Sequence, residues 1–359
     1  MHRLLQRQSL VSQTAEMLRQ DLAAGLWPER LPGEIELCQR LQISRTTLRA
    51  ALGVLTREGL LSSSQGRRRE VLKRGALKKT PATSRRVVLL TPEPPHRLGA
   101  FAMFWMDDLR EHLAETGCHL EVHTSRVCFS ARPDAALERL ARELRPAAWV
   151  LYLSTEPMQR WFSARGLPCA VAGSRHAEMR LHSVDVDYHA IGQHAAWQFL
   201  SRGHRRLLVL ARETGFAGDL KTIEGARAAC AKEPKASVTV ALHDSTVPGI
   251  ARALERELRT PEPPTALLVA NSVYVLTALG WLARQGIAVP GAVSLIARDS
   301  EPFLDFVVPS VARYALPPTR FARRLSRVVL ALARGEVARA LDERLEPEFL
   351  PGETLGRLS

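Results

Sequence analysis

From residue 86 to the end of the chain, short apolar runs alternate with longer amphipathic stretches. An alternation of this kind is typical of strands and helices that take turns around a parallel sheet. The candidate strands are Val87–Leu90, His119–Val122, Ala148–Leu153, Cys169–Ala172, Leu207–Leu210, Val238–Leu242, Ala266–Ala270 and Val293–Ala297. Helical periodicity fills several gaps between them, namely Phe101–Thr116, Asp134–Leu144, His189–Arg202 and Ser272–Gln285. The pattern predicts an α/β fold with parallel strands for this part of the chain.

A basic segment without apolar periodicity separates this region from the start of the chain. It runs from Leu72 to Arg86 and is rich in Lys, Arg and small residues. Such a composition is typical of a linker between domains. At about 150 residues per domain, a chain of 359 residues also favours two domains. We therefore expect a first domain over residues 1–72, a linker over 73–85 and a second domain over 86–359.

Apolar residues recur at helical spacing in three places before the linker. The three stretches are Ala15–Leu26, Leu37–Leu41 and Leu48–Leu55. Each of them predicts a short amphipathic helix. Ser44 is placed to cap the third helix, and Gly59 follows its expected end. Residues 60–63 and 70–73 are then expected to pair as a small hairpin.

The start of the third helix carries side chains that suit a DNA groove. With its leucines facing inward, Arg45 and Arg49 lie one turn apart on the outer face, and Thr46 and Thr47 lie near the helix start. Arginine reads guanine edges or binds phosphate, and threonine bonds phosphate or touches a thymine methyl. The hairpin turn, Gln65–Arg69, adds three arginines that suit the DNA backbone or the minor groove. This spacing predicts a helix-turn-helix that enters a major groove.

The distribution of charge favours a polyanionic partner. The chain has 50 Lys and Arg residues against 37 Asp and Glu residues, which gives a net charge of +13. Residues 1–85 contain 16 basic and 7 acidic residues and so account for +9 of that charge. Phosphate attraction explains such an excess, which a purely structural packet of helices does not need. We expect double-stranded DNA as the partner, and no membrane, because the apolar stretches are far shorter than the about 18 residues of a membrane helix.

Several motifs of the first region occur in a fixed order. They are Leu-Pro-Gly-Glu before the second helix, Leu-Gln-Ile-Ser-Arg-Thr-Thr-Leu-Arg-Ala-Ala-Leu into the third, and Arg-Glu-Gly-Leu-Leu with Gln-Gly after it. In this order the sequence over about residues 10–72 resembles the winged helix-turn-helix of GntR-type transcription regulators. The resemblance implies groove contacts by Arg45, Thr46, Thr47 and Arg49 and wing contacts by Gln65, Gly66 and Arg67. Ile35 and Arg68 depart from the family pattern, which has an arginine and a second wing glycine there.

The second region carries four motifs of another kind, at Ser183–Asp187, Leu200–Leu207, Gly286–Pro290 and Val293–Ala297. Through these motifs, residues 86–359 resemble the effector-binding domain of the lactose-repressor family, which is similar to type I periplasmic binding proteins. The resemblance implies two α/β lobes joined by crossover strands, with a small polar ligand, often a sugar, bound between them. That family's own DNA-binding headpiece is replaced here by the winged helix and the basic linker.

Two polar residues lie directly or just after predicted strands, where ligands of parallel sheets bind. Asn271 and Asp299 occupy these places and match two ligand-contacting positions of the family. Their other interpretation is structural, since Asn271 is placed to cap a helix and Asp299 to stabilise a loop. Thr222 stands where the family has an arginine, and Lys221 beside it is a candidate substitute.

Three further side chains lie after the first predicted strand of the second domain. Thr91, Phe101 and Trp105 are candidates to supply polar and stacking contacts to the ligand, and the aromatic pair is equally suited to a core. Ser272 and Gly173 replace acidic residues that the family pattern has. The expected ligand set is therefore Asn271, Asp299, Thr91, Trp105 and Thr222, and much of the usual sugar-binding set is missing.

Other patterns favour structure over chemistry. His119 and His123 lie on one face of a strand but lack a third metal ligand. Asp185 and Asp187 precede a helix, where an acid favours the helix dipole. Five cysteines without a C-x-x-C pair predict neither a disulfide framework nor a zinc site. Because the phosphate-loop, nucleophile-elbow, dinucleotide and zinc-protease motifs are all missing, we expect no enzyme, no cofactor and no metal.

Together these patterns predict a cytoplasmic, homodimeric transcription regulator, a repressor by its resemblance, whose affinity for operator DNA is controlled by a small polar ligand such as a sugar. Two alternatives remain. One is a solute-binding protein without a regulatory role, and the other is a DNA-binding regulator whose altered cleft holds no ligand.

Overall fold

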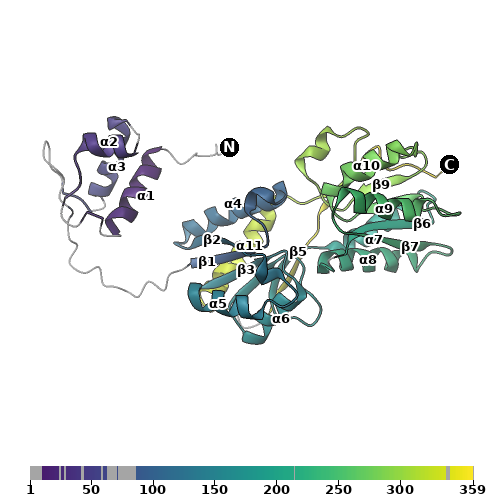
Figure 1. The fold of residues 1–359 in the computed structure, drawn as a ribbon, viewed down its shortest axis with the longest axis horizontal. Coiled ribbons are helices and arrows are strands. Elements are labelled where there is room, and N and C mark those ends of the chain that lie inside the picture. Colours follow the sequence, from purple (N-terminus) through teal and green to yellow (C-terminus); the bar gives the residue numbers. More distant parts are fainter. Residues whose placement is uncertain are drawn as a thin grey trace. The chain divides into compact units, whose positions relative to one another are not determined.

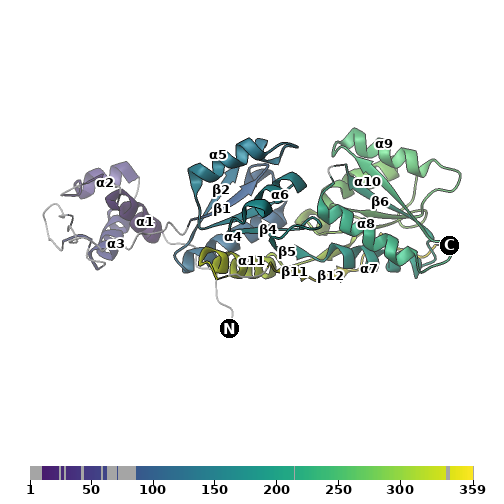
Figure 2. The same ribbon diagram turned by 90° about the horizontal axis from the view of Figure 1, so that it is seen from below.

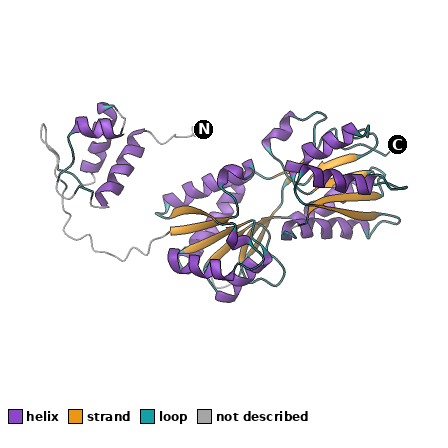
Figure 3. Cartoon of the chain, in the orientation of Figure 1, coloured by secondary structure: helices purple, strands orange, loops and turns teal. Residues whose placement is uncertain are grey.

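The computed structural model describes residues 10–23, 26–27, 30–41, 44–57, 60–62, 71, 86–213, 215–336 and 340–358. The chain forms two compact units, Met1–Ala82 and Thr83–Ser359. Figure 1 draws both units in the colours of the sequence, and Figure 3 shows that the strands belong to the second unit. Among the described helices, none has the length and apolar character needed to cross a membrane.

The described part of the first unit contains the helices α1 (Leu10–Ala23), α2 (Glu34–Leu41) and α3 (Arg45–Arg57). Leucines at the predicted spacing fill its core, and Leu18, Leu37, Leu48, Leu52 and Leu55 are each at most 1% exposed. The three predicted helices are thus confirmed, although the first ends at Ala23 rather than at Leu26. Leu61 and Val71 form one antiparallel bridge of the predicted hairpin. The hairpin turn and Gly59 lie outside the described residues.

The cap of α3 is confirmed at the atomic level. The backbone N–H of Thr47 donates to Ser44 Oγ over 3.1 Å. The two side-chain hydroxyls, Ser44 Oγ and Thr47 Oγ1, lie 2.9 Å apart. A serine at this position supplies the acceptor that the first turn of a helix lacks, so the local sequence determines where α3 begins.

The second unit contains two lobes. The first, which we call the N-lobe, has a six-stranded sheet in the order β11-β5-β4-β3-β1-β2, and every pair of neighbours is parallel. Its strands are β1 (Arg86–Thr91), β2 (His119–Thr124), β3 (Ala148–Tyr152), β4 (Cys169–Ala172), β5 (His182–Val186) and β11 (Asp342–Leu345). Its helices are α4 (Ala100–Glu115), α5 (Asp134–Leu144), α6 (Glu156–Arg165) and α11 (Pro318–Ala333).

Alternation along the strands decides which helices cover each face of this sheet. Val87 and Leu89 of β1 belong to the same apolar cluster as side chains of α4 and α11. Val88 and Leu90 point the other way and join the cluster that α5 and α6 complete. Figure 2 shows α5 and α11 on opposite sides of the sheet. A strand with both faces covered reads as a continuous apolar run, as β1 does.

The second lobe, which we call the C-lobe, has a six-stranded sheet in the order β12-β10-β9-β8-β6-β7. The strands are β6 (Arg206–Arg212), β7 (Ser237–His243), β8 (Ala266–Val269), β9 (Ser294–Ala297), β10 (Ala312–Ala315) and β12 (Glu348–Leu350), of which β12 runs antiparallel to β10. Its helices are α7 (Tyr188–Leu200), α8 (Ala217–Cys230), α9 (Val247–Leu258) and α10 (Val275–Arg284). Side chains of α7 and α8 pack on one face, and those of α9 and α10 on the other.

Four strands were not expected from the sequence, namely β5, β10, β11 and β12. They have three to five residues each, and polar or charged side chains interrupt them, as in the sequence Asp-Glu-Arg-Leu of β11. The eight expected strands all form, with ends that differ by at most two residues. The expected helix Ser272–Gln285 forms as a 3₁₀ turn (Ser272–Tyr274) followed by α10.

The chain passes between the lobes at three places. These places are the residue between β5 and α7, the residues between β10 and α11, and those between β11 and β12.

Helices α7 and α8 approach each other very closely, because a glycine from each helix lies at the contact. A Cβ added to Gly192 would lie 2.1 Å from the carbonyl oxygen of Thr222, and one added to Gly225 would lie 2.1 Å from that of His189.

Candidate functional site

The outer face of α3 carries the predicted DNA-reading residues. Arg45, Thr46 and Arg49 are exposed, and Thr47 is half-buried with its hydroxyl against that of Ser44. Arg49 Nε donates to Glu34 Oε2 over 2.9 Å, and its side chain remains 65% exposed. The structure thus places the two predicted arginines one turn apart at the surface. The predicted wing residues Gln65, Gly66 and Arg67 lie outside the described residues.

A cavity of about 330 Å³ lies between the two lobes of the second unit. Its wall includes Trp105 and Tyr152 from the N-lobe and Asn271, Arg298 and Asp299 from the C-lobe. Cavities of this size, with apolar walls and a few polar groups, are typical of small-molecule sites. Three of the five expected ligand residues, Trp105, Asn271 and Asp299, therefore come together.

Thr91 and Thr222, the other two expected ligand residues, do not line this cavity. Thr91 is completely buried at the end of β1, where its hydroxyl donates to the carbonyl oxygen of Glu93. Thr222 is also completely buried, and its hydroxyl donates to the carbonyl oxygen of Gly218 over 2.9 Å. Both side chains lie behind the cavity wall, and their hydroxyls bond to carbonyl oxygens of nearby residues.

Two arginines that sequence analysis did not single out share one buried carboxylate in the cavity wall. Arg298 Nη1 lies 2.6 Å from Asp219 Oδ1, and Arg212 Nε lies 3.0 Å from Asp219 Oδ2. Burial by itself would raise the pKa of Asp219, but the two guanidinium groups hold it below its usual range. Asp219 is therefore ionised, and the group of three carries a net positive charge.

Arg298 also explains the threonine that replaces the expected arginine. Its Nη1 atom lies 3.3 Å from the hydroxyl of Thr222, so a guanidinium from the end of β9 reaches the position on α8. The guanidinium also lies over the ring of Tyr188, 4.4 Å from its centre. Arg298 and Arg212 directly follow the apolar cores of β9 and β6, so their position after a strand was the signal that could have identified them.

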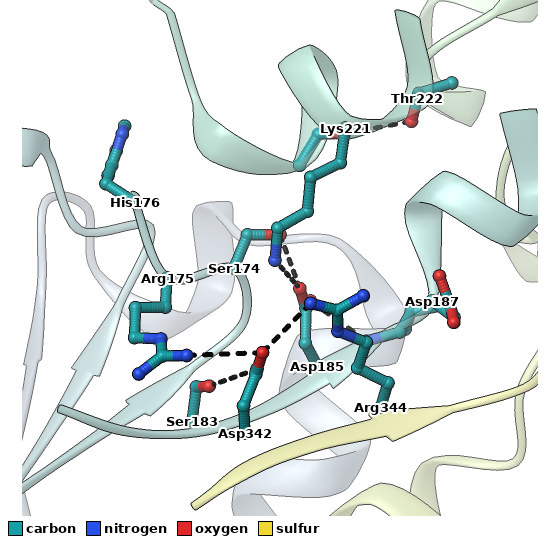
Figure 4. A network of polar contacts seen from close by, with 12 residues as sticks. Ser174, Arg175, His176, Ser183, Asp185, Asp187, Lys221, Thr222, Asp342 and Arg344 are labelled. Carbon is teal, nitrogen blue, oxygen red and sulfur yellow. Dashed lines mark hydrogen bonds and ion pairs between the residues drawn. The ribbon is translucent and has the colours of Figure 1, made fainter. Parts of the chain in front are cut away.

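Lys221, the candidate substitute for the missing arginine, has a different partner. Its ammonium lies 3.1 Å from Asp185 Oδ2, and Asp185 is only 1% exposed. Ser174 Oγ donates to the same oxygen over 2.6 Å. Because Lys221 belongs to α8 and Asp185 to β5, this ion pair joins the two lobes (Figure 4). Asp187, two residues on, accepts from the N–H of Ala190 and caps α7, which confirms its structural role.

A second polar cluster lies beside this ion pair, within the N-lobe. Asp342 of β11 accepts from the hydroxyl of Ser183 over 2.8 Å. Its other oxygen lies 3.3 Å from Arg175 Nη2 and 3.0 Å from Arg344 Nη2 (Figure 4). The cluster holds the short strand β11 against β5, which its apolar content alone would not specify.

Asn271 and Asp299 both line the cavity and stabilise a turn, so both interpretations that the sequence left open fit their positions. Asn271 Oδ1 accepts from the N–H of Val273 over 3.0 Å, and Asp299 Oδ1 accepts from the N–H of Ser272 over 2.6 Å. Each therefore stabilises the turn before α10 while it also lines the cavity. The second carboxylate oxygen of Asp299 lies 3.9 Å from Arg298 Nη2.

Aromatic rings form the N-lobe side of the cavity. The ring of Trp105 meets Tyr152 and Phe321 at centroid distances of 5.3 and 5.4 Å, and Phe101 meets Phe321 at 5.7 Å. The indole N–H of Trp105 is buried and has no acceptor among the described residues. Arg298 Nε, in the opposite wall, likewise lacks an acceptor there. Both nitrogen atoms are buried, so neither is accessible to a ligand in this conformation.

Glu301 provides a second connection between the lobes. It lies in the loop after β9, and its carboxylate accepts from the backbone N–H of Ala100 at the start of α4 over 2.8 Å. Burial and the neighbouring Asp299 raise the pKa of Glu301, while its backbone hydrogen bonds lower it.

Within the described residues there is no group of three metal-ligating side chains, and His119 is exposed on β2.

Two family matches divide the chain in the same way as its two units. Residues 10–71 match the family described as bacterial regulatory proteins, gntR family. Residues 196–355 match the periplasmic binding protein-like domain. The chain thus contains a GntR-type helix-turn-helix and a periplasmic-binding-protein-like effector domain, as the resemblances imply.

The names of two curated relatives describe transcriptional regulators. The HTH-type transcriptional repressor CytR of Escherichia coli (strain K12) is 26% identical over 183 residues, which cover 48% of this chain and 51% of CytR. The HTH-type transcriptional regulator GntR of Pseudomonas aeruginosa is 26% identical over 239 residues, which cover 63% of this chain and 68% of that protein. The chain spans about half the length of the first of these relatives.

Solved structures share the fold of this chain. A complex of the transcriptional regulator CelR with cellobiose has a TM-score of 0.66 at 20% identity and covers 87% of this chain and 92% of its own. A LacI family regulator from Bifidobacterium animalis subsp. lactis has a TM-score of 0.65 at 18% identity and covers 77% of this chain and 99% of its own. At this identity the likeness shows the fold alone.

Proposed function

We propose that this chain, which joins a GntR-type helix-turn-helix to a periplasmic-binding-protein-like effector domain, is a transcription regulator whose operator affinity depends on a small polar ligand. The observation that carries the proposal is the presence of both domains in one chain. A protein that only binds DNA, or only binds a small ligand, would need just one of these two domains. The name of the relative CytR supports repression as the mode of action.

In the first unit, we assign DNA binding to the outer face of α3. Arg45 and Arg49 would contact guanine edges or phosphates, and Thr46 would contact the backbone near the helix start. Thr47 is assigned a smaller part because its hydroxyl already meets Ser44. The wing residues Gln65, Gly66 and Arg67 remain assigned to the adjacent DNA backbone.

In the second unit, we assign effector binding to the interlobe cavity. Trp105, Asn271 and Asp299 keep the role that the sequence predicts for them, and Arg298 and Arg212 join them. Thr222 is reassigned as a support for Arg298, and Thr91 is left out of the set. The CelR structure contains cellobiose, and another solved LacI family structure contains ribose, so a sugar is the first ligand class to test.

Signal transfer needs two states of the second unit that differ in ligand affinity. We propose that ligand binding changes the relation between the lobes, and through the linker the placement of the DNA-binding units in a homodimer. A dimer would present two α3 helices to a two-fold operator in the cytoplasm, where bacterial DNA lies.

The decisive experiment is selection of genomic DNA fragments by the full chain at physiological salt. A recovered palindromic site bound at about 10⁻⁸ to 10⁻¹¹ M would support the regulator. The double variant Arg45→Ala, Arg49→Ala should then lose specific binding. A matched control removes two exposed arginines of the second unit, Arg110 and Arg160, and should retain it.

Other outcomes separate the alternatives. Weak recovery that does not depend on sequence, with ligand binding intact, would favour a solute-binding protein without a regulatory role. Specific DNA binding with no thermal shift from any sugar or metabolite at saturating concentration would favour a regulator whose cavity holds no ligand.

A further inference from the structure

The charges of the interlobe cavity are almost completely matched to one another. Arg212 and Arg298 meet Asp219, and Arg298 also lies near Asp299. In addition, Arg97 lies 3.7 Å from Glu93. Lys221, behind the wall, neutralises Asp185. Among the described residues that line the cavity, the carboxylates therefore outnumber the arginines, five to three.

Glu301 is the carboxylate that no side-chain cation matches in this set. Its partner is instead the backbone at the start of α4, where Ala100 N–H donates to Oε2 over 2.8 Å. The start of a helix attracts negative charge because its N–H groups are unpaired and its dipole is positive there. Glu301 thus occupies the place in the cavity wall that would otherwise receive an anion.

The sequence at the start of α4 is fitted to this carboxylate. A Cβ added to Gly99 would lie 2.3 Å from Glu301 Oε1, closer than such contacts allow. The backbone angles of Gly99 are extended, with φ of −63°, so its lack of a side chain is needed for space rather than for backbone conformation. Gly99 and Glu301 come from different lobes and fit each other sterically.

We infer that the cavity takes uncharged polar effectors and excludes those that carry a carboxylate or phosphate, with Glu301 as the residue that determines this specificity. The inference rests on the proposed function, since it concerns the effector of that same cavity. An anionic ligand would meet Glu301 in a wall where carboxylates outnumber arginines, and an uncompensated charge in a buried site is costly. The hydroxyl groups of a neutral ligand, in contrast, bring no charge into the cavity and do not carry this cost.

The test removes the Glu301 carboxylate by substitution and adds small anions in solution that could take its place. Acetate and inorganic phosphate are titrated at pH 7 into the full chain and into Glu301→Ala, with constant ionic strength and sodium chloride as the reference, by calorimetry and thermal melting. Wild type should show no binding beyond chloride. Glu301→Ala should gain affinity for both anions by up to about 30-fold, which is the range of a charge at a helix start.

Three further variants locate the effect. Glu111→Ala removes an exposed acidic residue of α4, outside the cavity wall, and should gain no anion binding. Gly99→Ala added to Glu301→Ala places a methyl group where the carboxylate oxygen was and should abolish the gain. Glu301→Ser is used in the same way if the alanine variant does not fold.

Anion binding to wild type as strong as to Glu301→Ala would overturn the inference, as would a Glu301→Ala variant without any gain. These results are independent of DNA. A failed operator selection beside a clear gain in anion binding would count against the regulator and leave the cavity specificity standing. A recovered operator beside a Glu301→Ala variant without any gain in anion binding would support the regulator and overturn the inferred cavity specificity.

Discussion

Arg298 and Asp219 form a hydrogen-bonded ion pair in which both side chains are less than 5% exposed and Nη1 and Oδ1 lie 2.6 Å apart. They come from the end of β9 and the first turn of α8, and 78 residues separate them in the sequence. Arg212 bonds to the second oxygen of the same carboxylate. The pair therefore fixes the C-lobe wall of the cavity before any ligand arrives.

Removal of this carboxylate should strongly destabilise the second unit. Asp219→Asn removes the carboxylate that both guanidinium groups bond to, and loss of one partner of a buried pair costs about 3–5 kcal/mol. Urea unfolding followed by circular dichroism measures the change. Asp107→Asn, which breaks an exposed ion pair with Arg110, should cost less than about 1 kcal/mol. Equal small effects of both substitutions would mean that the buried pair contributes little.

The contribution of Asp219 should depend on pH in a defined direction. Its pKa in the folded chain lies below the ordinary value of 3.8, so ionised Asp219 stabilises the fold. That stabilisation is complete above the unfolded value and is lost as the pH falls through the lower, folded value. The difference in unfolding free energy between wild type and Asp219→Asn should therefore be constant near neutral pH and shrink below about pH 4. A difference that grows on acidification would contradict this assignment.

The contact between α7 and α8 should not tolerate a methyl group. Gly225→Ala would bring its Cβ to 2.1 Å from the backbone oxygen of His189, so the helices must separate. Overpacking of this kind costs about 1–3 kcal/mol or more. Gly280→Ala is the control, since Gly280 is exposed in α10 with open space around its Cβ, and alanine there should stabilise by about 0.5–1 kcal/mol. Thermal unfolding of both variants checks the opposite signs.

Release of Arg49 from Glu34 should strengthen DNA binding. Glu34→Gln removes the carboxylate that holds the guanidinium, and an exposed pair is worth at most about 1 kcal/mol, or about fivefold in affinity. Glu36→Gln removes the same charge from the same turn of α2 and leaves the pair intact. Gel-shift titration at two salt concentrations compares them. Equal gains from both variants would show a general charge effect instead of a released contact.

Two substitutions separate the structural role of Asn271 from its role toward a ligand. Asn271→Ala loses the side-chain acceptor for Val273 N–H and should cost about 0.5–2 kcal/mol of stability. Asn271→Ser retains an acceptor there and should keep most of that stability. If Asn271 also binds the effector, the serine variant will still lose the thermal shift that the effector produces in wild type. If Asn271→Ser keeps both the stability and the effector-induced thermal shift of wild type, Asn271 has only the structural role of a cap.

Local periodicity was sufficient for most of the helices and strands. Helix α3 and strands β1 and β8 form as expected. Their signals are the leucines of α3, the serine before it and the apolar runs of the strands, and each signal depends on neighbours within a few residues. The short strand β11 could not be predicted, because its pairing depends on contacts such as those of Asp342 with Ser183 and Arg175. Such contacts join residues more than 150 positions apart.

The sequence alone determined the order of the two domains, the identity of the helix that carries Arg45 and Arg49, and the placement of Asn271 and Asp299 at strand ends. These features follow from periodicity, capping and topology, all of which act over short distances along the chain. Only the tertiary structure decided that Arg298 takes the place expected of an arginine at Thr222, and that Glu301 meets Gly99 across the lobes. The reason is physical: a charge in a cavity wall is stabilised by whatever lies nearest in space, and no local pattern records that neighbour.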